Sequence, residues 1–357
     1  MIGNSRLERD LSHPHMCRPA PKTDAESAKV HSQVEEVAMA AAMKPGWSKP
    51  STILFACEIP ANEKALGFAL AQAKESGANL ILFHAYDTMV VAASETSGIR
   101  YYDYAAAARA ETRHLEPLAH KVREAGVPCE IVVRPGLAAD QILGFLRERE
   151  VDRIVMGTHS PGPIGKLLVG SVAEAVLRTA KAPVYIVGPD VVEGKYRNYA
   201  TKTILCAISL LGTSHVIARF AAELAVQHNA RLVLQHVIRA QDRAEVLAGR
   251  TIDDIERDLL SLISNELREK IEVDAIVVPG DPTEELLYQG RAQQADLIVL
   301  GAHGASAFAA IARQGVVYKV LAHSHCPVIT LSPVVLADCG VKFDKEHRAE
   351  VFLAGVF

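Results

Sequence analysis

Short apolar runs alternate with longer amphipathic stretches along most of the chain. Residues 53–57 are apolar at every position, and residues 62–76 after them have a helical period. Four apolar residues share one face of that stretch: Leu66, Ala69, Leu70 and Ala73. Gly77 then stands where a helix would end. Runs that are almost wholly apolar are typical of parallel strands with helices on both faces, so the pattern predicts an α/β fold.

The same alternation continues beyond this first strand and helix. Further strands are expected at 79–84, 129–134, 153–156 and 183–187, and helices near 101–125, 138–149 and 171–180. Parallel strands joined through helices cross over with right-handed geometry, which gives an open, doubly wound sheet. We therefore predict a domain with a five-stranded parallel sheet.

The whole pattern occurs twice. Residues 80–84, Leu-Ile-Leu-Phe-His, return as residues 232–236, Leu-Val-Leu-Gln-His. Residues 152–157, Asp-Arg-Ile-Val-Met-Gly, return as residues 296–301, Asp-Leu-Ile-Val-Leu-Gly. Blocks that recur in one order, far apart, indicate a duplicated domain and not a short solenoid repeat.

The boundaries of four segments follow from this repeat. Repeat one covers residues 51–188 and repeat two covers residues 202–332. Residues 1–48 match neither repeat and are expected to form an N-terminal arm that is partly helical or disordered. Residues 333–357 form a C-terminal tail that could dock as a helix or lie disordered.

Composition narrows the functional classes. The chain has 357 residues, 49% of them hydrophobic, and a formal net charge of −4, which supplies no basic surface for nucleic acid. The first fifteen residues lack the apolar core of a signal peptide, and no run approaches the ~18 apolar residues of a membrane span. The six cysteines show no Cys-x-x-Cys spacing. We expect a cytoplasmic protein with reduced cysteines and with neither a nucleic-acid nor a membrane partner.

The loop after the fourth strand of repeat one has the most unusual composition. Ligands of doubly wound sheets bind outside the carboxyl ends of the strands, where this Gly-rich loop lies. Gly157 and Gly170 let the backbone approach a ligand closely, and Ser171 is expected to be the N-cap of the next helix. The helix N-terminus would then face a di- or triphosphate. The alternative is a Gly/Pro-rich connection that binds nothing.

The loop is not a Walker A motif. Ser160 stands in place of its first glycine, and Leu167 in place of the hydroxyl residue that would hold Mg²⁺.

Both repeats resemble domains of the universal stress protein family. The ATP-binding branch of that family shows Gly-x-x-Gly, nine residues, and then Gly-Ser or Gly-Thr. Gly157 fits the first position, Ser160 replaces the second glycine, and Gly170-Ser171 fit the end of the motif. An aspartate that ends the first strand in the family is Glu58 here.

The resemblance implies an ATP site in repeat one, to which Mg²⁺ could come with the nucleotide. Seven residues would form it: Glu58, Gly157, His159, Ser160, Gly162, Gly170 and Ser171. It also implies that each domain has the adenine nucleotide alpha-hydrolase-like fold. In this family, domains pair through their final strands, here 183–187 and 327–331. We therefore expect a pseudo-twofold internal dimer, and the chain could also form a homodimer.

Repeat two departs further from the motif. Three of its residues keep the first part: Gly301, His303 and Gly304. Nine residues later Gln314 replaces the glycine, unless a one-residue shift of the loop brings Gly315 into its place. Ser209 replaces the acid at the end of the first strand. ATP is therefore expected mainly in repeat one.

Catalytic and metal residues do not stand out. His159 and His303 occupy the same loop position and could contact phosphate or transfer a proton near neutral pH. The alternative for both is a loop histidine bonded to nearby backbone. No complete set of metal ligands and no Ser–His–acid or paired-carboxylate arrangement emerges.

Three hypotheses remain from the sequence. The first is a regulatory binding protein of the stress response, with an adenine nucleotide as ligand and a regulatory protein, as yet unknown, as partner. The second is a slow ATPase that uses the same loop, and the third is a protein-interaction scaffold without nucleotide. Fold alone does not choose among them.

Overall fold

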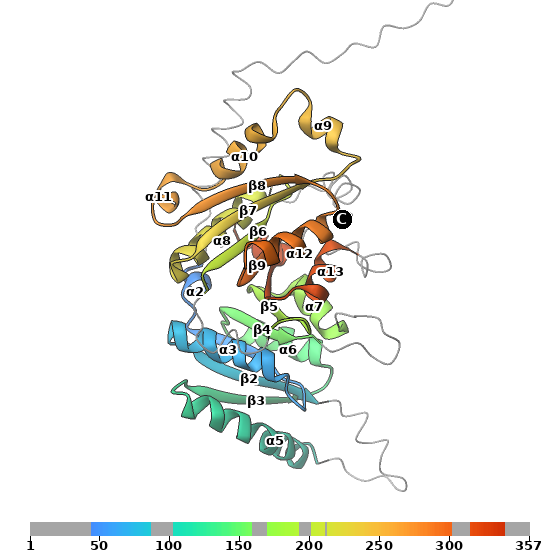
Figure 1. The fold of residues 1–357 in the computed structure, drawn as a ribbon. Coiled ribbons are helices and arrows are strands. Elements are labelled where there is room, and N and C mark those ends of the chain that lie inside the picture. The colour runs from blue at the N-terminus through green and yellow to red at the C-terminus, as the bar shows by residue number, and fades with distance from the viewer. Residues whose placement is uncertain are drawn as a thin grey trace, which may run out of the picture. The chain divides into compact units, whose positions relative to one another are not determined.

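The computed structural model describes residues 44–86, 103–158, 170–192, 201–210, 213–301 and 315–339. Their ten strands form one sheet in the order β3-β2-β1-β4-β5-β10-β9-β6-β7-β8, which can be followed in Figure 1. Repeat one supplies β1 (Thr52–Ala56), β2 (Asn79–Tyr86), β3 (Cys129–Pro135), β4 (Arg153–Gly157) and β5 (Val184–Val187). Repeat two supplies β6 (Thr203–Ala207), β7 (Arg231–Ile238), β8 (Val273–Pro279), β9 (Leu297–Gly301) and β10 (Val328–Leu331).

Each repeat has its five strands parallel, in the same relative order. In repeat one β1 pairs with both β2 and β4, so the strand order reverses at β1. In repeat two β6 holds the same position between β7 and β9. The predicted pair of doubly wound domains is confirmed.

The two half-sheets join through their last strands. β5 and β10 pair antiparallel, with Tyr185 opposite Ile329. Just beyond β10, Ser332 is fully buried and its hydroxyl donates to the carbonyl oxygen of Ala180 at 2.6 Å. Each repeat therefore covers the strand edge that the other would otherwise expose, as expected for the internal dimer.

Helices cover both faces of the sheet. Apolar residues of five helices pack on one face: α3 (Glu63–Ser76), α5 (Tyr104–Glu124), α8 (Ser214–His228), α10 (Ile252–Ser261) and α14 (Pro333–Asp338). Residues of four others pack on the opposite face: α6 (Ala138–Glu148), α7 (Ser171–Thr179), α12 (Pro282–Ala292) and α13 (Val316–His323). The remaining helices of the described residues are three short ones: α2 (Pro45–Ser48), α9 (Arg243–Leu247) and α11 (Asn265–Arg268).

Local sequence signals fix both ends of helix α3. Asn62 is the N-cap of α3, and its side-chain oxygen accepts a hydrogen bond from the backbone N–H of Ala65 at 3.1 Å. Gly77 ends α3 with a left-handed φ of 70°, as its place in the sequence predicts.

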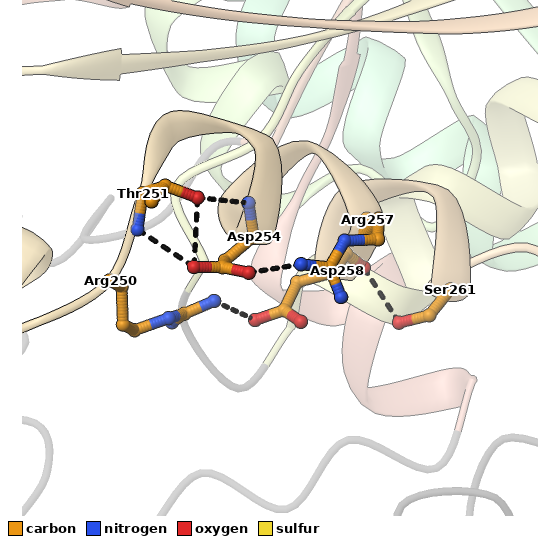
Figure 2. A network of polar contacts seen from close by, with 6 residues as sticks. All are labelled: Arg250, Thr251, Asp254, Arg257, Asp258 and Ser261. Atoms are coloured by element: carbon orange, nitrogen blue, oxygen red, sulfur yellow. Dashed lines mark hydrogen bonds and ion pairs between the residues drawn. The ribbon is translucent and has the colours of Figure 1, made fainter.

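The repeats differ beyond their second strands. In repeat one α5 packs along β3, whereas α10 packs along β8 in repeat two (Figure 1). Figure 2 shows that a capping box begins α10: Thr251 accepts from the backbone N–H of Asp254 at 3.2 Å, and the Asp254 carboxylate accepts from the backbone N–H of Thr251 at 2.8 Å. Arg257 pairs with Asp254, and Arg250 with Asp258.

Two of the sequence-based expectations concern residues that the structure does not describe. This applies to the helix expected within the N-terminal arm and to the tail beyond residue 339. The first residues of the tail form α14, whose Val335 and Leu336 are buried. Within the described part of the chain, no helix combines the length and the apolar character needed to span a membrane.

Candidate functional site

A cavity of about 580 Å³ opens at the carboxyl ends of the strands of repeat one. Residues 56–58 line it from the end of β1, residues 156–158 from the end of β4, and residues 62–64 from the start of α3. Gly188 and Pro189, just beyond β5, complete this side of the cavity. It therefore lies at the reversal of strand order, where doubly wound folds place their ligands.

The remaining lining is apolar. β2 contributes Phe83 and Ala85, and the facing helix α6 contributes Ala138 and Ile142. Phe83 is held in place by Phe145, with ring centroids 5.3 Å apart. This end of the cavity suits a flat apolar group.

Gly157 lies against the side chain of Asn62, and the close approach of a ligand that the sequence suggests for this glycine stays a prediction. A Cβ atom added at Gly157 would lie 2.6 Å from Nδ2 of Asn62 and 2.9 Å from its Cβ. The Asn62 amide also donates to the carbonyl oxygen of Thr158 at 3.5 Å. The absence of a side chain at Gly157 therefore lets the cap of α3 lie against the end of β4.

Thr158 is a lining residue that the motif analysis did not select. Its backbone N–H donates to the carbonyl oxygen of Val187 at 3.1 Å, which extends the pairing of β4 with β5. The residue is 6% exposed, and its side-chain hydroxyl has no hydrogen-bond partner among the residues that the structure describes. A local signal for it would have been a polar residue directly after the apolar run of residues 154–157.

The N-terminus of α7 reaches the same cavity through Val172. The expected cap is one residue off: Gly170 is the N-cap, with ψ of 155°, and Ser171 is the first residue of the helix and is exposed. As the N-cap, Gly170 makes no side-chain hydrogen bond to the helix, so a neighbouring group could bind its first N–H groups. Glycine and serine both suit an N-cap, which is the physical reason for the shift of one residue.

Three charged residues line the described part of the cavity. Glu58 is exposed at its rim, and Glu63 pairs with Lys121 of α5 at 2.8 Å. Lys64 is the cation among these lining residues, and its ammonium donates to the carbonyl oxygen of Pro189 at 2.8 Å.

The thiol of Cys57 also lines the cavity. Burial raises its pKa far above the usual range, so the group stays a neutral thiol at physiological pH.

The strand-end histidines bond to the backbone of the neighbouring strand. Nδ1 of His84 lies 3.0 Å from the carbonyl oxygen of Cys57, and Nε2 lies 3.7 Å from the carboxylate of Glu111. In repeat two, Nδ1 of His236 lies 2.8 Å from the carbonyl oxygen of Ile208. Burial lowers the pKa of His236, while the bond to Ile208 opposes this shift.

The structure brings together part of the predicted site. Glu58 and Gly157 share the cavity, and Gly170-Ser171 begin the helix that reaches it. In repeat two, Gly301 ends β9 and Gly315 is the N-cap of α13. The remaining five predicted residues lie outside the described part of the chain: His159, Ser160, Gly162, His303 and Gly304.

Two doubly wound domains joined through their last strands, with a cavity at a strand-order reversal, define a tandem α/β protein. The model of the Universal stress protein family matches residues 50–188 and 200–332. The chain therefore belongs to the universal stress protein family.

Individual relatives agree with this assignment. Universal stress protein YxiE of Bacillus subtilis is 32% identical over 131 residues, which are 35% of this chain and 88% of the relative. A universal stress protein of Thermus aquaticus is 33% identical over 126 residues, 35% of this chain and 88% of the relative. The crystal structure of a universal stress protein from Archaeoglobus fulgidus superposes with a TM-score of 0.60 at 21% identity, covering 79% of this chain and 96% of that one. This last likeness supports the tandem fold.

Proposed function

We propose that this universal stress protein binds an adenine nucleotide in repeat one and regulates a protein partner according to its nucleotide occupancy. The observation that carries the proposal is the cavity of about 580 Å³ at the ends of β1 and β4. The volume of the cavity lies within the range of small-molecule sites. The cavity extends from the apolar lining of β2 and α6 to the N-terminus of α7. A nucleotide base suits the apolar lining, and a phosphate chain suits the N-terminus of the helix.

The residues present fit such a ligand. Phe83 and Ile142 offer apolar contact to a base, and the carboxylate of Glu58 can accept hydrogen bonds from ribose hydroxyls. Gly170, as the N-cap, puts no side chain beside the first N–H groups of α7. Among the described residues no group of three or more His, Cys, Asp or Glu could hold a metal ion, so Mg²⁺ would enter bound to the phosphates.

We assign the protein to the cytoplasm. Five cysteines in the described residues are free thiols, which suits a reducing compartment.

The proposal is tested with the full chain. Mass spectrometry of ligand released from the purified protein, followed by calorimetric titration with ATP, AMP and adenosine, should reveal one nucleotide per chain. A protein that carries no ligand and gives no heat with any of them would refute the site and favour the nucleotide-free scaffold. Steady release of phosphate from ATP would favour the slow ATPase.

A matched pair of variants locates the site. Gly170 and Gly315 are the N-caps of α7 and α13, with φ of −60° and −68°, so a side chain strains neither backbone. Gly170→Val should abolish most ATP binding by filling the phosphate space, whereas Gly315→Val should leave it intact. Equal losses from both variants would contradict a site confined to repeat one.

A further inference from the structure

The exit segment, residues 188–192, follows β5 and lies between the cavity of repeat one and the body of repeat two. Gly188 and Pro189 line the cavity. The backbone N–H of Val192 donates to the carbonyl oxygen of His325 in repeat two at 3.2 Å. The same five residues therefore contact both the candidate site and the other repeat.

The exit segment packs against the last turn of α13. A Cβ atom added at Gly188 would lie 2.5 Å from the carbonyl oxygen of Leu321, so the two backbones are in contact with no side chain between them. Oδ2 of Asp190 lies 3.6 Å from Nδ1 of His323, the last residue of α13. A displacement of the exit segment therefore moves the end of α13 or breaks these contacts.

Lys64 of α3 holds the exit segment from the side of repeat one. Its side chain lines the cavity, and its ammonium donates to the carbonyl oxygen of Pro189 at 2.8 Å. The carbonyl oxygen is a neutral acceptor, and an anionic oxygen binds an ammonium more strongly. A ligand that brings an anionic group into the cavity therefore competes with Pro189 for this cation.

The other charges of the lining direct an anionic group toward Lys64. In the described part of the lining, Lys64 is the one cation, and the two remaining charged residues are Glu58 and Glu63. Glu63 is paired with Lys121 of α5 at 2.8 Å. Because both carboxylates repel an anion, contact with Lys64 is the favourable electrostatic interaction that these residues offer.

We propose that Lys64 and the exit segment form a switch that reports occupancy of the cavity to repeat two. In the ligand-free protein the ammonium of Lys64 holds Pro189. In the occupied protein the ammonium binds the anionic group of the ligand, and the released exit segment loosens the last turn of α13. This inference rests on the proposed nucleotide site and gives that site a regulatory output at the junction of the repeats.

Hydrogen exchange of the full chain, measured by mass spectrometry, tests the switch. Peptides that cover residues 188–192 and 320–325 should exchange about tenfold faster when ATP or AMP is bound. The reason is that the hydrogen bonds from Val192 to His325 and from Ser324 to Val320 then open more often. Adenosine has no anionic group, so both peptides should keep their ligand-free rates when adenosine is bound.

Substitutions at Lys64 separate the tether from the ligand. Lys64→Met should release the exit segment without any ligand, so both peptides should exchange at the rate of the ATP-bound wild type, and ATP should accelerate them no further. Lys64→Arg keeps a cationic donor and should respond to ATP as the wild type does. Peptides of the buried strand β1 should keep wild-type exchange in each variant, which excludes global unfolding.

Lys74 supplies the matched control. It lies on the same helix, is exposed and is not among the described residues that line the cavity. Lys74→Met removes the same charge from α3 and should leave the exchange of both peptides unchanged, with and without ATP.

The outcomes separate this inference from the proposed function. If calorimetry shows that ATP binds but both peptides keep their ligand-free rates, the switch is wrong and the nucleotide site stands. Wild-type rates in ligand-free Lys64→Met, or equally fast exchange with adenosine, overturn the role of Lys64. If the wild type binds none of the three ligands, the proposed function falls, and the switch falls with it.

Discussion

Arg153, the first residue of β4, donates a hydrogen bond from Nη2 to Oε1 of Gln227 in α8 at 2.8 Å and so joins the two repeats. The arginine is fully buried, and the same nitrogen also donates to the carbonyl oxygen of Trp47 at 3.2 Å. Its other terminal nitrogen bonds to Gln72 of α3, and its guanidinium lies 5.3 Å from the ring centroid of Tyr185. One cation thus connects α2, α3, β5 and α8.

Replacing this arginine should destabilise the protein strongly. Arg153→Met leaves the amide oxygens of the buried Gln72 and the half-buried Gln227 without their donor, and breaking a polar network of this kind costs about 2–4 kcal/mol in free energy of unfolding. Urea denaturation of the full chain measures this loss of unfolding free energy.

Arg149 provides the control for that substitution. It pairs with Glu130 at 2.6 Å, but its side chain is 43% exposed, so Arg149→Met should cost less than about 1 kcal/mol. Equal costs for the two variants would show that the Arg153 cluster does not stabilise the junction.

Gly157 and Asn62 should behave as a coupled pair. Gly157→Ala places a methyl group against the Asn62 side chain, which must move and give up its cap of α3. Asn62→Ala alone should cost about 1 kcal/mol, the usual loss of an N-cap. Gly157→Ala alone should cost more, because it adds steric overlap to the lost cap.

The double variant tests the coupling. Once Asn62 is alanine, only the contact with the Cβ of residue 62 remains, so the Gly157→Ala substitution should cost less unfolding free energy than it does in the wild type. Additive costs would mean that the two residues act independently.

The buried histidine of repeat two should make stability depend on pH. Burial lowers the pKa of His236 in the folded state, despite the opposing bond to Ile208 and the charge of Asp242, whereas in the unfolded chain the pKa is about 6.5. Below about pH 6.5 the unfolded state therefore binds the additional proton, and the free energy of unfolding falls as the pH is lowered. The fall from this residue ends below its folded-state pKa.

His236→Gln should reduce this loss between pH 7.5 and 5.5, as measured by urea denaturation at each pH. His120→Gln is the control, because that side chain is 73% exposed and the variant should keep the wild-type pH dependence. A pH dependence that His236→Gln leaves unchanged would assign the effect to other groups.

The capping box of α10 should stabilise the N-terminus of that helix. Thr251→Ala removes the acceptor for the Asp254 N–H and should cost about 1 kcal/mol in free energy of unfolding. Arg257, which contacts Asp254 in Figure 2, supplies the comparison. Its side chain is 73% exposed, so Arg257→Ala should cost less than about 0.5 kcal/mol. The reverse ranking in thermal or urea unfolding would contradict the capping assignment.

The sequence by itself determined the elements, their order and the duplication. Periodicity is a local property, so the helix over residues 62–76 and the strand over 153–156 could be placed within one or two residues. The cap of α7 was predicted at Ser171 and lies at Gly170, because a serine and a preceding glycine both suit that position.

Only the tertiary structure decided which polar residues are buried and which residues they contact. Arg153 follows an aspartate at the start of a strand, a position that by sequence could equally face water, yet it contacts residues 81 and 74 positions away. Thr158 next to Gly157 looks like any loop threonine, yet it pairs with the end of β5 and is buried. Burial and hydrogen-bond satisfaction depend on atoms that are remote in the chain, and for that reason no local pattern could specify them.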